Sequence, residues 1–338
     1  KPLDPREMVL KVGEVAASTA PAPISTPVSL DAEIVIGADD LFERITSDEL
    51  WSCTTCRACD EICPVNIEIL DKILDMRRYK ALMEADFPTE LGKAFVALEN
   101  QGNPWGLSQQ NRMDWANDLD FEVKVLGEAG VDSADYLYWV GCAGSFDDRN
   151  IEVTKATARL LHEAGVDFAI LGPKESCTGD PARRSGNEYL YQQLALSNIE
   201  TLNDLGVERV ITQCPHCFNS LANDYPQLGG DYEVVHHSQL LMELVGSGSL
   251  DTTAATGKKP EITFHDPCYL GRHNDVYVAP REVVSAAGAS LTEMERNGTN
   301  AMCCGAGGAR FWLEEQTGKK VNVERAEQAI ATGAEEVA

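Results

Sequence analysis

The chain has 338 residues, which is enough for two or three domains that each bury a hydrophobic core. Its 54 acidic and 28 basic residues give a formal net charge of −26, which argues against nucleic acid or an anionic membrane surface as a direct partner and favours a partner protein with a basic face. The 11 cysteines are clustered at metal-ligand spacings, so we expect a reducing, cytoplasmic compartment. No apolar run reaches the roughly 18 residues that a membrane-spanning helix needs.

The first 50 residues predict a short helix and a linker. Asp4 is placed to cap the helix, and Pro5 occupies its first turn. The stretch 16–29, rich in Ala, Ser, Thr and Pro, has the composition of a flexible linker. Because the chain starts with Lys1 rather than methionine, we expect a fragment of a longer protein, with residues 1–50 forming a linker and the remnant of an upstream segment.

Four cysteines follow in the spacing C-x2-C-x2-C-x3-C-P, at Cys53, Cys56, Cys59 and Cys63. Three thiolates on so short a loop bind three irons of a [4Fe–4S] cube, and in two-cluster ferredoxins the fourth cysteine ligates the other cube. Cys63 therefore predicts a second such motif, either upstream of Lys1 or in a partner. Four structural or zinc-binding cysteines are the alternative.

Two helices are expected after this cysteine run. Apolar residues recur at helical spacing from Ile67 to Leu74, and a second helical stretch lies between Pro88 and Gly102. Residues 51–130 are therefore predicted to form a small, helical ferredoxin-like domain.

From residue 135 onward, short apolar strands alternate with amphipathic helices, which is typical of an α/β layer fold. We expect strands at 136–140, 168–171 and 208–213 and helices at 150–164 and 188–205. After a linker at 246–260 the order restarts, so an internal repeat is predicted, with one copy at 134–246 and a second at 260–338.

The cysteines repeat together with the strands. A separation of 35 positions joins Cys142 to Cys177 in the first copy and Cys268 to Cys303 in the second. The first copy continues to the pair in CPHC, Cys214 and Cys217. The equivalent pair of the second copy is expected just beyond the last residue, so that copy is predicted to be incomplete at its C-terminus.

The four cysteines of the first copy are expected at the carboxyl ends of neighbouring strands, where α/β sheets place ligand sites. They suit an iron–sulfur cluster or a closed zinc site, and CPHC alone also suits a redox dithiol. In the second copy, Cys268 joins the adjacent pair Cys303 and Cys304, which precedes the glycine run 305–308. Adjacent cysteines bridge or cap an irregular cluster or serve sulfur chemistry, and glycines allow backbone N–H groups close to the sulfurs. A phosphate loop is disfavoured because no Gly-Lys-Ser/Thr follows.

The segments HDPCYLGRHNDVY (265–277), CCGAGGARFW (303–312) and CPHCFNSLANDYP (214–226) resemble the cysteine-rich CCG domain of heterodisulfide-reductase-type iron–sulfur oxidoreductases. The resemblance covers residues 51–338 and is strongest to the D-type subunits of that family, in which two ferredoxin cubes precede two CCG repeats. It implies an α+β multidomain fold, with a small helical ferredoxin-like domain followed by a duplicated α/β CCG-domain module.

The resemblance also implies a function. Actinobacterial relatives carry an N-terminal membrane domain and pass electrons from electron-transfer flavoprotein to menaquinone. By this resemblance the chain is expected to be an iron–sulfur oxidoreductase subunit that uses [4Fe–4S] clusters at the cytoplasmic face of the membrane. Electron-transfer flavoprotein is then the expected redox partner, and a membrane quinone-reducing domain is expected upstream in the full-length protein. A heterodisulfide or 2-hydroxy-acid (glycolate or lactate) oxidoreductase subunit and a non-catalytic cluster- or zinc-binding scaffold are the alternatives.

Carried over residue by residue, the family motif is incomplete in both copies. Ser176 stands where the first copy would have an adjacent cysteine, so an ordinary four-thiolate site is expected there. The redox-active, catalytic residues are expected in the second copy, where the cluster is cubane or non-cubane: Cys268, Cys303 and Cys304. All eleven cysteines are then assigned as cluster or metal ligands.

The histidines near these cysteines have structural as well as functional interpretations. His216 is expected to tune the CPHC site rather than ligate. His265 and His273 flank Cys268 and either deliver protons or hold the loop. His236 and His237 are expected to be capping or packed residues.

Three further residues follow the ferredoxin run. Arg77 and Arg78 are expected to be solvated or to guide a partner. Trp105 is expected to pack over the cluster loop.

Overall fold

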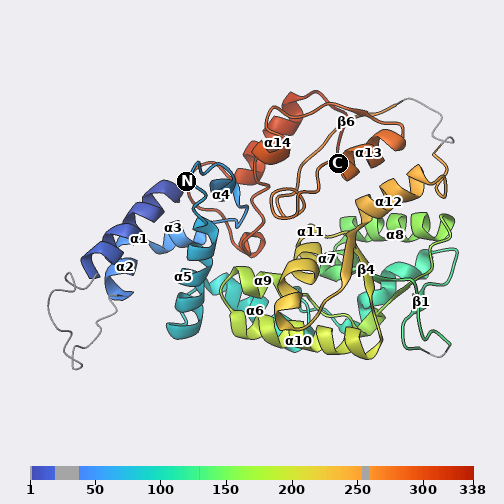
Figure 1. The fold of residues 1–338 in the computed structure, drawn as a ribbon, viewed down its shortest axis with the longest axis horizontal. Coiled ribbons are helices and arrows are strands. Elements are labelled where there is room, and N and C mark those ends of the chain that lie inside the picture. The colour runs from blue at the N-terminus through green and yellow to red at the C-terminus, as the bar shows by residue number, and fades with distance from the viewer. Residues whose placement is uncertain (1, 20–37, 129, 253–258) are drawn as a thin grey trace.

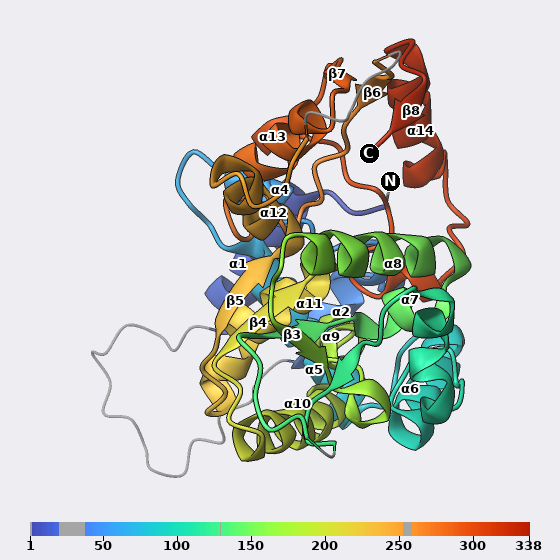
Figure 2. The same cartoon turned by 90° about the vertical axis from the view of Figure 1, so that its right-hand side faces the viewer.

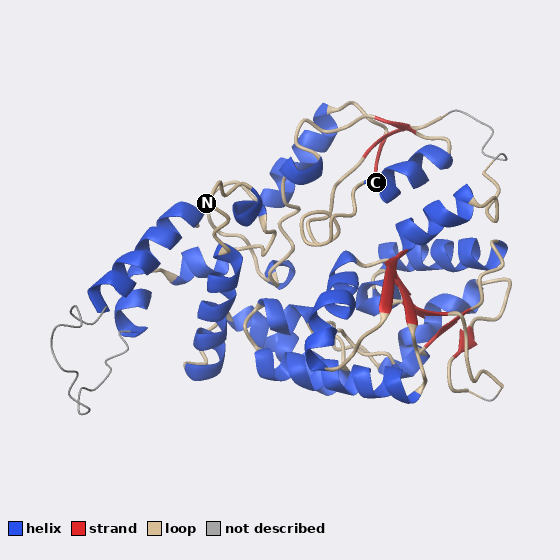
Figure 3. Ribbon diagram, viewed as in Figure 1, coloured by secondary structure: helices blue, strands red, loops and turns tan. Residues whose placement is uncertain are grey.

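The computed structural model describes all residues of the chain except 1, 20–37, 129 and 253–258 (Figure 1). Helices predominate, and the strands gather in two separate parallel sheets (Figure 3).

The N-terminal part is helical, as predicted. Asp4 caps the first helix, because its carboxylate accepts hydrogen bonds from the backbone N–H groups of Arg6 and Glu7 at 2.9 and 3.3 Å. This helix continues through residues 16–19, so the linker prediction is wrong there; alanine favours helices as well as linkers, and residues 20–29 lie outside the described part of the chain. The elements are α1 (Pro5–Thr19), α2 (Ala38–Arg44), α3 (Ser47–Trp51), α4 (Ala58–Glu61), α5 (Ile69–Met83), α6 (Thr89–Gln101) and η1 (Gln109–Asp118).

The first sheet has five parallel strands in the order β1-β3-β2-β4-β5. Its strands are β1 (Lys124–Val125), β2 (Tyr136–Trp139), β3 (Phe168–Ile170), β4 (Arg209–Thr212) and β5 (Glu233–His236). The helices that connect or follow these strands are α7 (Gly141–Phe146), α8 (Asp148–Glu163), α9 (Asp180–Arg184), α10 (Glu188–Asp204), α11 (Pro215–Asn219) and α12 (His237–Gly246). β1 lies within the range 51–130, and its pairing with β3 attaches the end of that range to the sheet.

Alternate residues of the central strand β2 face two different cores. Leu137 and Trp139 belong to a core shared with α10 and the helical N-terminal part. Tyr136 and Tyr138 belong to a second core with α8, α12 and η1. Figure 2 shows α8 and α10 on opposite sides of this sheet. All four side chains are buried, so the strand is anchored on both faces and its carboxyl end is fixed in place.

The second sheet repeats the centre of the first. It has the order β7-β6-β8, with β6 (Glu261–Thr263), β7 (Ser290–Leu291) and β8 (Glu336–Val337), and its helices are α13 (Val278–Ala286) and α14 (Val321–Ala331). In each repeat the first strand, β2 or β6, lies between the two strands that follow it, so β3-β2-β4 corresponds to β7-β6-β8. The second unit lies above the first in Figure 1 and contacts the helical N-terminal part through the loop that carries Cys303 and Cys304.

Candidate functional site

The four cysteines of the first repeat come together at one edge of the five-stranded sheet. Cys142 follows β2, Cys177 follows β3, and Cys214 and Cys217 follow β4, and these strands are neighbours in the sheet. All four line a single cavity of about 250 Å³, whose other walls include Trp105, Phe311 and Trp312. The backbone N–H of Cys177 also donates to the carbonyl of Gly102, which ties the site to the end of α6.

A buried ion pair lies behind Cys142. The Arg112 guanidinium donates to the Cys142 Sγ at 3.3 Å and to Glu175 Oε1 at 3.0 Å. Glu175 also accepts the backbone N–H groups of Val140 and Gly141 at 3.0 and 2.8 Å, so its carboxylate fixes the start of α7. The hydrogen bond from Cys177, opposed by burial, and the Arg112 charge lower the pKa of Cys142. The roles of Arg112 and Glu175 beside Cys142 were not predicted from the sequence. The signal that the sequence offers for Glu175 is its position two residues before Cys177.

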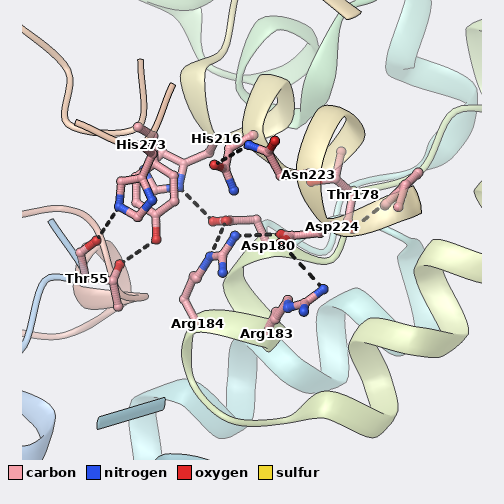
Figure 4. Close-up of polar contacts among 12 residues, drawn as sticks. Thr55, Thr178, Asp180, Arg183, Arg184, His216, Asn223, Asp224 and His273 are labelled. Carbon is pink, nitrogen blue, oxygen red and sulfur yellow. Dashed lines mark hydrogen bonds and ion pairs between the residues drawn. The ribbon is translucent and has the colours of Figure 1, made fainter. Parts of the chain in front are cut away.

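A second ionic network holds the CPHC loop (Figure 4). His216 Nδ1 lies 2.8 Å from Asp180 Oδ2, and Asp180 also accepts a hydrogen bond from Arg184 Nε at 3.0 Å. Burial disfavours the charged imidazole, but Asp180 outweighs it and raises the pKa of His216 to about 9. The hydrogen bond from Cys217, again opposed by burial, and the His216 charge lower the pKa of Cys214 to about 6. The network therefore favours the thiolate form of Cys214, which is the form of cysteine that binds metals.

In the second repeat, backbone N–H groups point at the adjacent cysteines. Gly305 N–H donates to Cys303 Sγ at 3.2 Å, and Ala306 N–H donates to Cys304 Sγ at 3.5 Å. The hydrogen bond from Cys303, partly opposed by burial, and another from His265 lower the pKa of Cys304 to about 3. A cavity of about 340 Å³ opens beside Cys304.

The ferredoxin loop and the second repeat meet directly at a contact that we call the loop junction, formed by residues 53–57 and 303–308. Cys303 Sγ donates to Thr54 Oγ1 at 3.2 Å. The hydrogen bond from Cys303, opposed by burial, lowers the pKa of Cys56 to about 5. A Cβ atom at Gly307 would lie 2.4 Å from the Thr54 carbonyl oxygen, and one at Gly308 would lie 2.6 Å from that of Cys53. These two glycines therefore allow the two cysteine loops to touch, a role that was not predicted from the sequence.

Arg77 lies at the centre of this arrangement, and the expectation that it is solvated is wrong. Its side chain is fully buried and donates hydrogen bonds to four backbone carbonyls in three parts of the chain. The acceptors are Leu50, Cys53, Arg184 and Gly308. Its neighbour Arg78 is partly buried against Asp75 and Glu188. The helical spacing gave no means of telling these two arginines apart.

Three aromatic rings join the cysteine loops. His216 stacks on Tyr269 with ring centroids 4.0 Å apart, and Tyr269 stacks on His273 at 4.1 Å. His273 Nε2 lies 3.0 Å from the Thr55 carbonyl, and burial lowers the pKa of His273 to about 3, which supports loop holding rather than proton delivery. His236 caps α12, and both it and His237 have lowered pKa values through burial, as expected of packed residues.

One expected placement, that of Trp105, differs in the structure, whereas the role predicted for Cys63 stays a prediction. Trp105 packs edge-on against Trp312 and lines the first-repeat cavity, so it covers that site rather than the ferredoxin loop. Cys63 accepts a hydrogen bond from the Ile67 backbone and lies between two exposed apolar residues, Ile62 and Val65.

The candidate metal ligands at all these positions are cysteine thiols. Backbone N–H groups donate to the sulfurs of Cys53, Cys63, Cys303 and Cys304 at 3.2 to 3.5 Å, as is typical of iron–sulfur ligation. Within the described ranges, no three His, Cys, Asp or Glu side chains converge as the ligands of one metal ion would. The chemistry of the donor set fits iron–sulfur clusters.

Comparison with known proteins gives the family. Residues 136–222 and 262–338 match the cysteine-rich domain family CCG. The chain is 46% identical over 291 residues to the probable iron-sulfur-binding oxidoreductase FadF of Bacillus subtilis, covering 85% of this chain and 41% of that protein. It is 44% identical over 304 residues to the EtfAB:quinone oxidoreductase of Syntrophomonas wolfei, covering 87% and 42%.

A third relative is matched over more of its length. The D subunit of the dihydromethanophenazine:CoB–CoM heterodisulfide reductase of Methanosarcina mazei is 31% identical over 296 residues, covering 85% of this chain and 69% of that protein. No solved structure matches.

The chain therefore belongs to the family of CCG-domain iron–sulfur proteins, which confirms the resemblance and the duplicated α/β module. It spans less than half the length of the first two relatives. No helix among the described residues has the length and apolar character needed to cross a bilayer.

Proposed function

We propose that this chain relays single electrons through [4Fe–4S] clusters between electron-transfer flavoprotein and a membrane quinone. The observation that carries the proposal is the loop junction, where the ferredoxin cysteine loop touches the adjacent cysteines of the second repeat. Two redox sites in contact form a relay, whereas sites that only hold protein chains together need no such contact. The name of the Syntrophomonas relative supports the flavoprotein and quinone as partners.

Each group of cysteines has its own role in this proposal. Cys53, Cys56 and Cys59 hold three corners of a ferredoxin cube, and Cys63 serves a second cube whose remaining ligands lie elsewhere in the complete protein. The first repeat holds a relay cluster on its four cysteines. The second repeat, with Cys268, Cys303 and Cys304, is the redox-active centre, which is cubane or non-cubane. When bound, such clusters accept and donate one electron at a potential set by charge, hydrogen bonds and solvent exposure.

The protein's own residues supply those settings. N–H donors from Gly305 and Ala306 and the buried Arg77 and Arg112 charges stabilise negative charge on the sulfurs. Trp105 and Trp312 cover the first-repeat cavity and reduce its contact with water. We further propose functional units at 51–130, 134–246 and 260–338, located at the cytoplasmic face of the membrane.

The full-length protein, purified anaerobically, tests this proposal. We expect iron and acid-labile sulfide in equal amounts, electron paramagnetic resonance signals from reduced clusters, and reoxidation of those clusters by a soluble quinone after reduction by electron-transfer flavoprotein. Stoichiometric zinc without sulfide would refute the cluster assignment. Reduction by a heterodisulfide or 2-hydroxy-acid couple, but not by the flavoprotein, would refute the choice of partner.

A further inference from the structure

The stacked rings of His216, Tyr269 and His273 form one continuous column between the three cysteine loops. His216 lies between Cys214 and Cys217 in the first repeat, and Tyr269 directly follows Cys268 in the second. The interplanar angles are 30° for the first pair and 5° for the second. The column therefore begins inside one candidate cluster loop and passes a second.

The other end of the column, at His273, is fixed to the ferredoxin loop. Tyr269 Oη lies 2.7 Å from Thr55 Oγ1, and His273 Nε2 lies 3.0 Å from the carbonyl oxygen of the same threonine. Thr55 lies between Cys53 and Cys56 and is itself fully buried. Hydrogen bonds thus hold two of the three rings against the loop that carries the ferredoxin cysteines.

His216, at the first-repeat end of the column, and Tyr269, in its middle, are also held in place. Asp180 holds His216, and Arg184 holds Asp180 and lies over the Tyr269 ring, with its Cζ 5.3 Å from the centroid. Tyr269 is 1% exposed, so its ring is surrounded on all sides. Packing and a hydrogen bond hold the ring in contact with both histidines.

We propose that the Tyr269 ring couples the first-repeat site electronically to the second-repeat site, and this rests on the proposed relay function. Electron tunnelling weakens steeply across gaps and is favoured through conjugated rings in van der Waals contact. With clusters bound in both repeats, one electron would pass from the cluster of one repeat to the cluster of the other. The tyrosine mediates this transfer without being oxidised or deprotonated, so no further reactant or proton is needed.

The test uses the full-length protein with its clusters and compares three variants. Y269L removes the ring, and Y269M removes it with a more adaptable side chain in case leucine prevents folding. Y269F keeps the ring and loses only the hydrogen bond to Thr55. Y232L is the matched control, since Tyr232 is also buried but contacts Ile199 and Asn203 instead.

The measurement is the rate of electron redistribution between the two repeats after rapid reduction, followed by freeze-quench electron paramagnetic resonance. Iron content and the cluster reduction potentials are measured on the same samples. We expect Y269L or Y269M to slow the transfer by about tenfold, with iron content and potentials unchanged. Y269F and Y232L should keep the wild-type rate.

Three results would overturn the inference. The first is a wild-type rate in Y269L or Y269M. The second is slow transfer that is accompanied by lost iron or shifted potentials, because the tyrosine would then act only by shaping the sites. The third is slow transfer in Y269F, which would assign the effect to the hydroxyl. A wild-type protein without cluster signals would instead refute the proposed function itself.

Discussion

Replacing Arg77 with methionine removes a buried guanidinium that donates to backbone carbonyls and lies over the Trp51 ring, with its Cζ 4.9 Å from the centroid. Its five hydrogen bonds reach four carbonyl oxygens at 2.7 to 3.2 Å, from α3, the ferredoxin loop, α9 and the glycine run. Methionine has an adaptable shape but no donor. All four acceptors then lose a partner at a site where the arginine side chain is fully buried.

The expected cost follows from those acceptors. A buried acceptor without a partner costs about 1–3 kcal/mol, but neighbouring losses are not additive and some carbonyls find water. Breaking a buried charged network costs about 3–5 kcal/mol, and we expect R77M to fall in that range. R77K keeps the charge with three donors instead of five, so a loss of about 1–3 kcal/mol is expected.

Urea unfolding of the cluster-free chain measures these differences, provided that the slope of the unfolding free energy against urea stays constant. R159M is the control, since Arg159 lies on the exposed face of α8 and should change stability by less than about 0.5 kcal/mol. If R77M lost no more than R159M, the carbonyl cage around Arg77 would not be a source of stability. If R77K lost as much as R77M, the charge alone would contribute nothing.

Three further predictions concern the cysteine loops. G308A should lower both the stability and the iron content, because its Cβ would lie 2.6 Å from the Cys53 carbonyl oxygen. G318A is the control, since Gly318 has a similar φ (+66° against +64°) but open space around it, so this variant should lose only the stability that backbone strain costs. Equal losses in the two variants would contradict the close-contact role of Gly308. C303S and C304S in the full-length protein should abolish electron transfer to quinone while assembly persists, as checked by size-exclusion chromatography, and unchanged turnover would favour a scaffold. Burial alone would raise the pKa of Asp180, but His216 and Arg184 lower it to about 2. The ionised carboxylate therefore stabilises the fold by roughly 2 kcal/mol above pH 4. This contribution is lost as the pH falls toward 2. Urea unfolding of wild type and D180N should therefore differ at pH 6 and converge toward pH 2, and a difference that stays constant with pH would refute the assignment.

Much of the fold was predictable because local patterns determine it. Apolar runs and glycine stops located β2, β3 and β4 and the helices α8 and α10 to within a few residues. The 35-residue spacing of cysteines in both copies predicted the duplication, which the common strand order and the family match confirm. Cysteines at the ends of neighbouring parallel strands were expected to meet, since the strands share one sheet edge.

The contacts between the units were not predictable, because they join residues that are far apart in sequence. Arg77 and the Gly308 carbonyl are 231 positions apart, and Cys303 and Thr54 are 249 apart. An arginine on an amphipathic helix is usually solvated, and nothing near Arg77 in the sequence signals the carbonyls that surround it. The glycine run was expected to serve the sulfurs, and it does so through Gly305, but Gly307 and Gly308 serve the approach of another loop.

The distribution of positive charge connects these observations to the proposed function. The chain has a net charge of −26, yet six arginines and no lysine are buried among the described residues. Three of the six contact a cysteine directly: Arg77 at the Cys53 carbonyl, Arg112 at the Cys142 sulfur and Arg272 at the Cys56 carbonyl. Burying a cation costs several kcal/mol unless negative charge lies nearby, and a planar guanidinium is the cation that keeps its charge and satisfies several acceptors at once. In the proposed relay, thiolates holding iron and sulfide would supply that negative charge, and these three arginines would stabilise the reduced clusters.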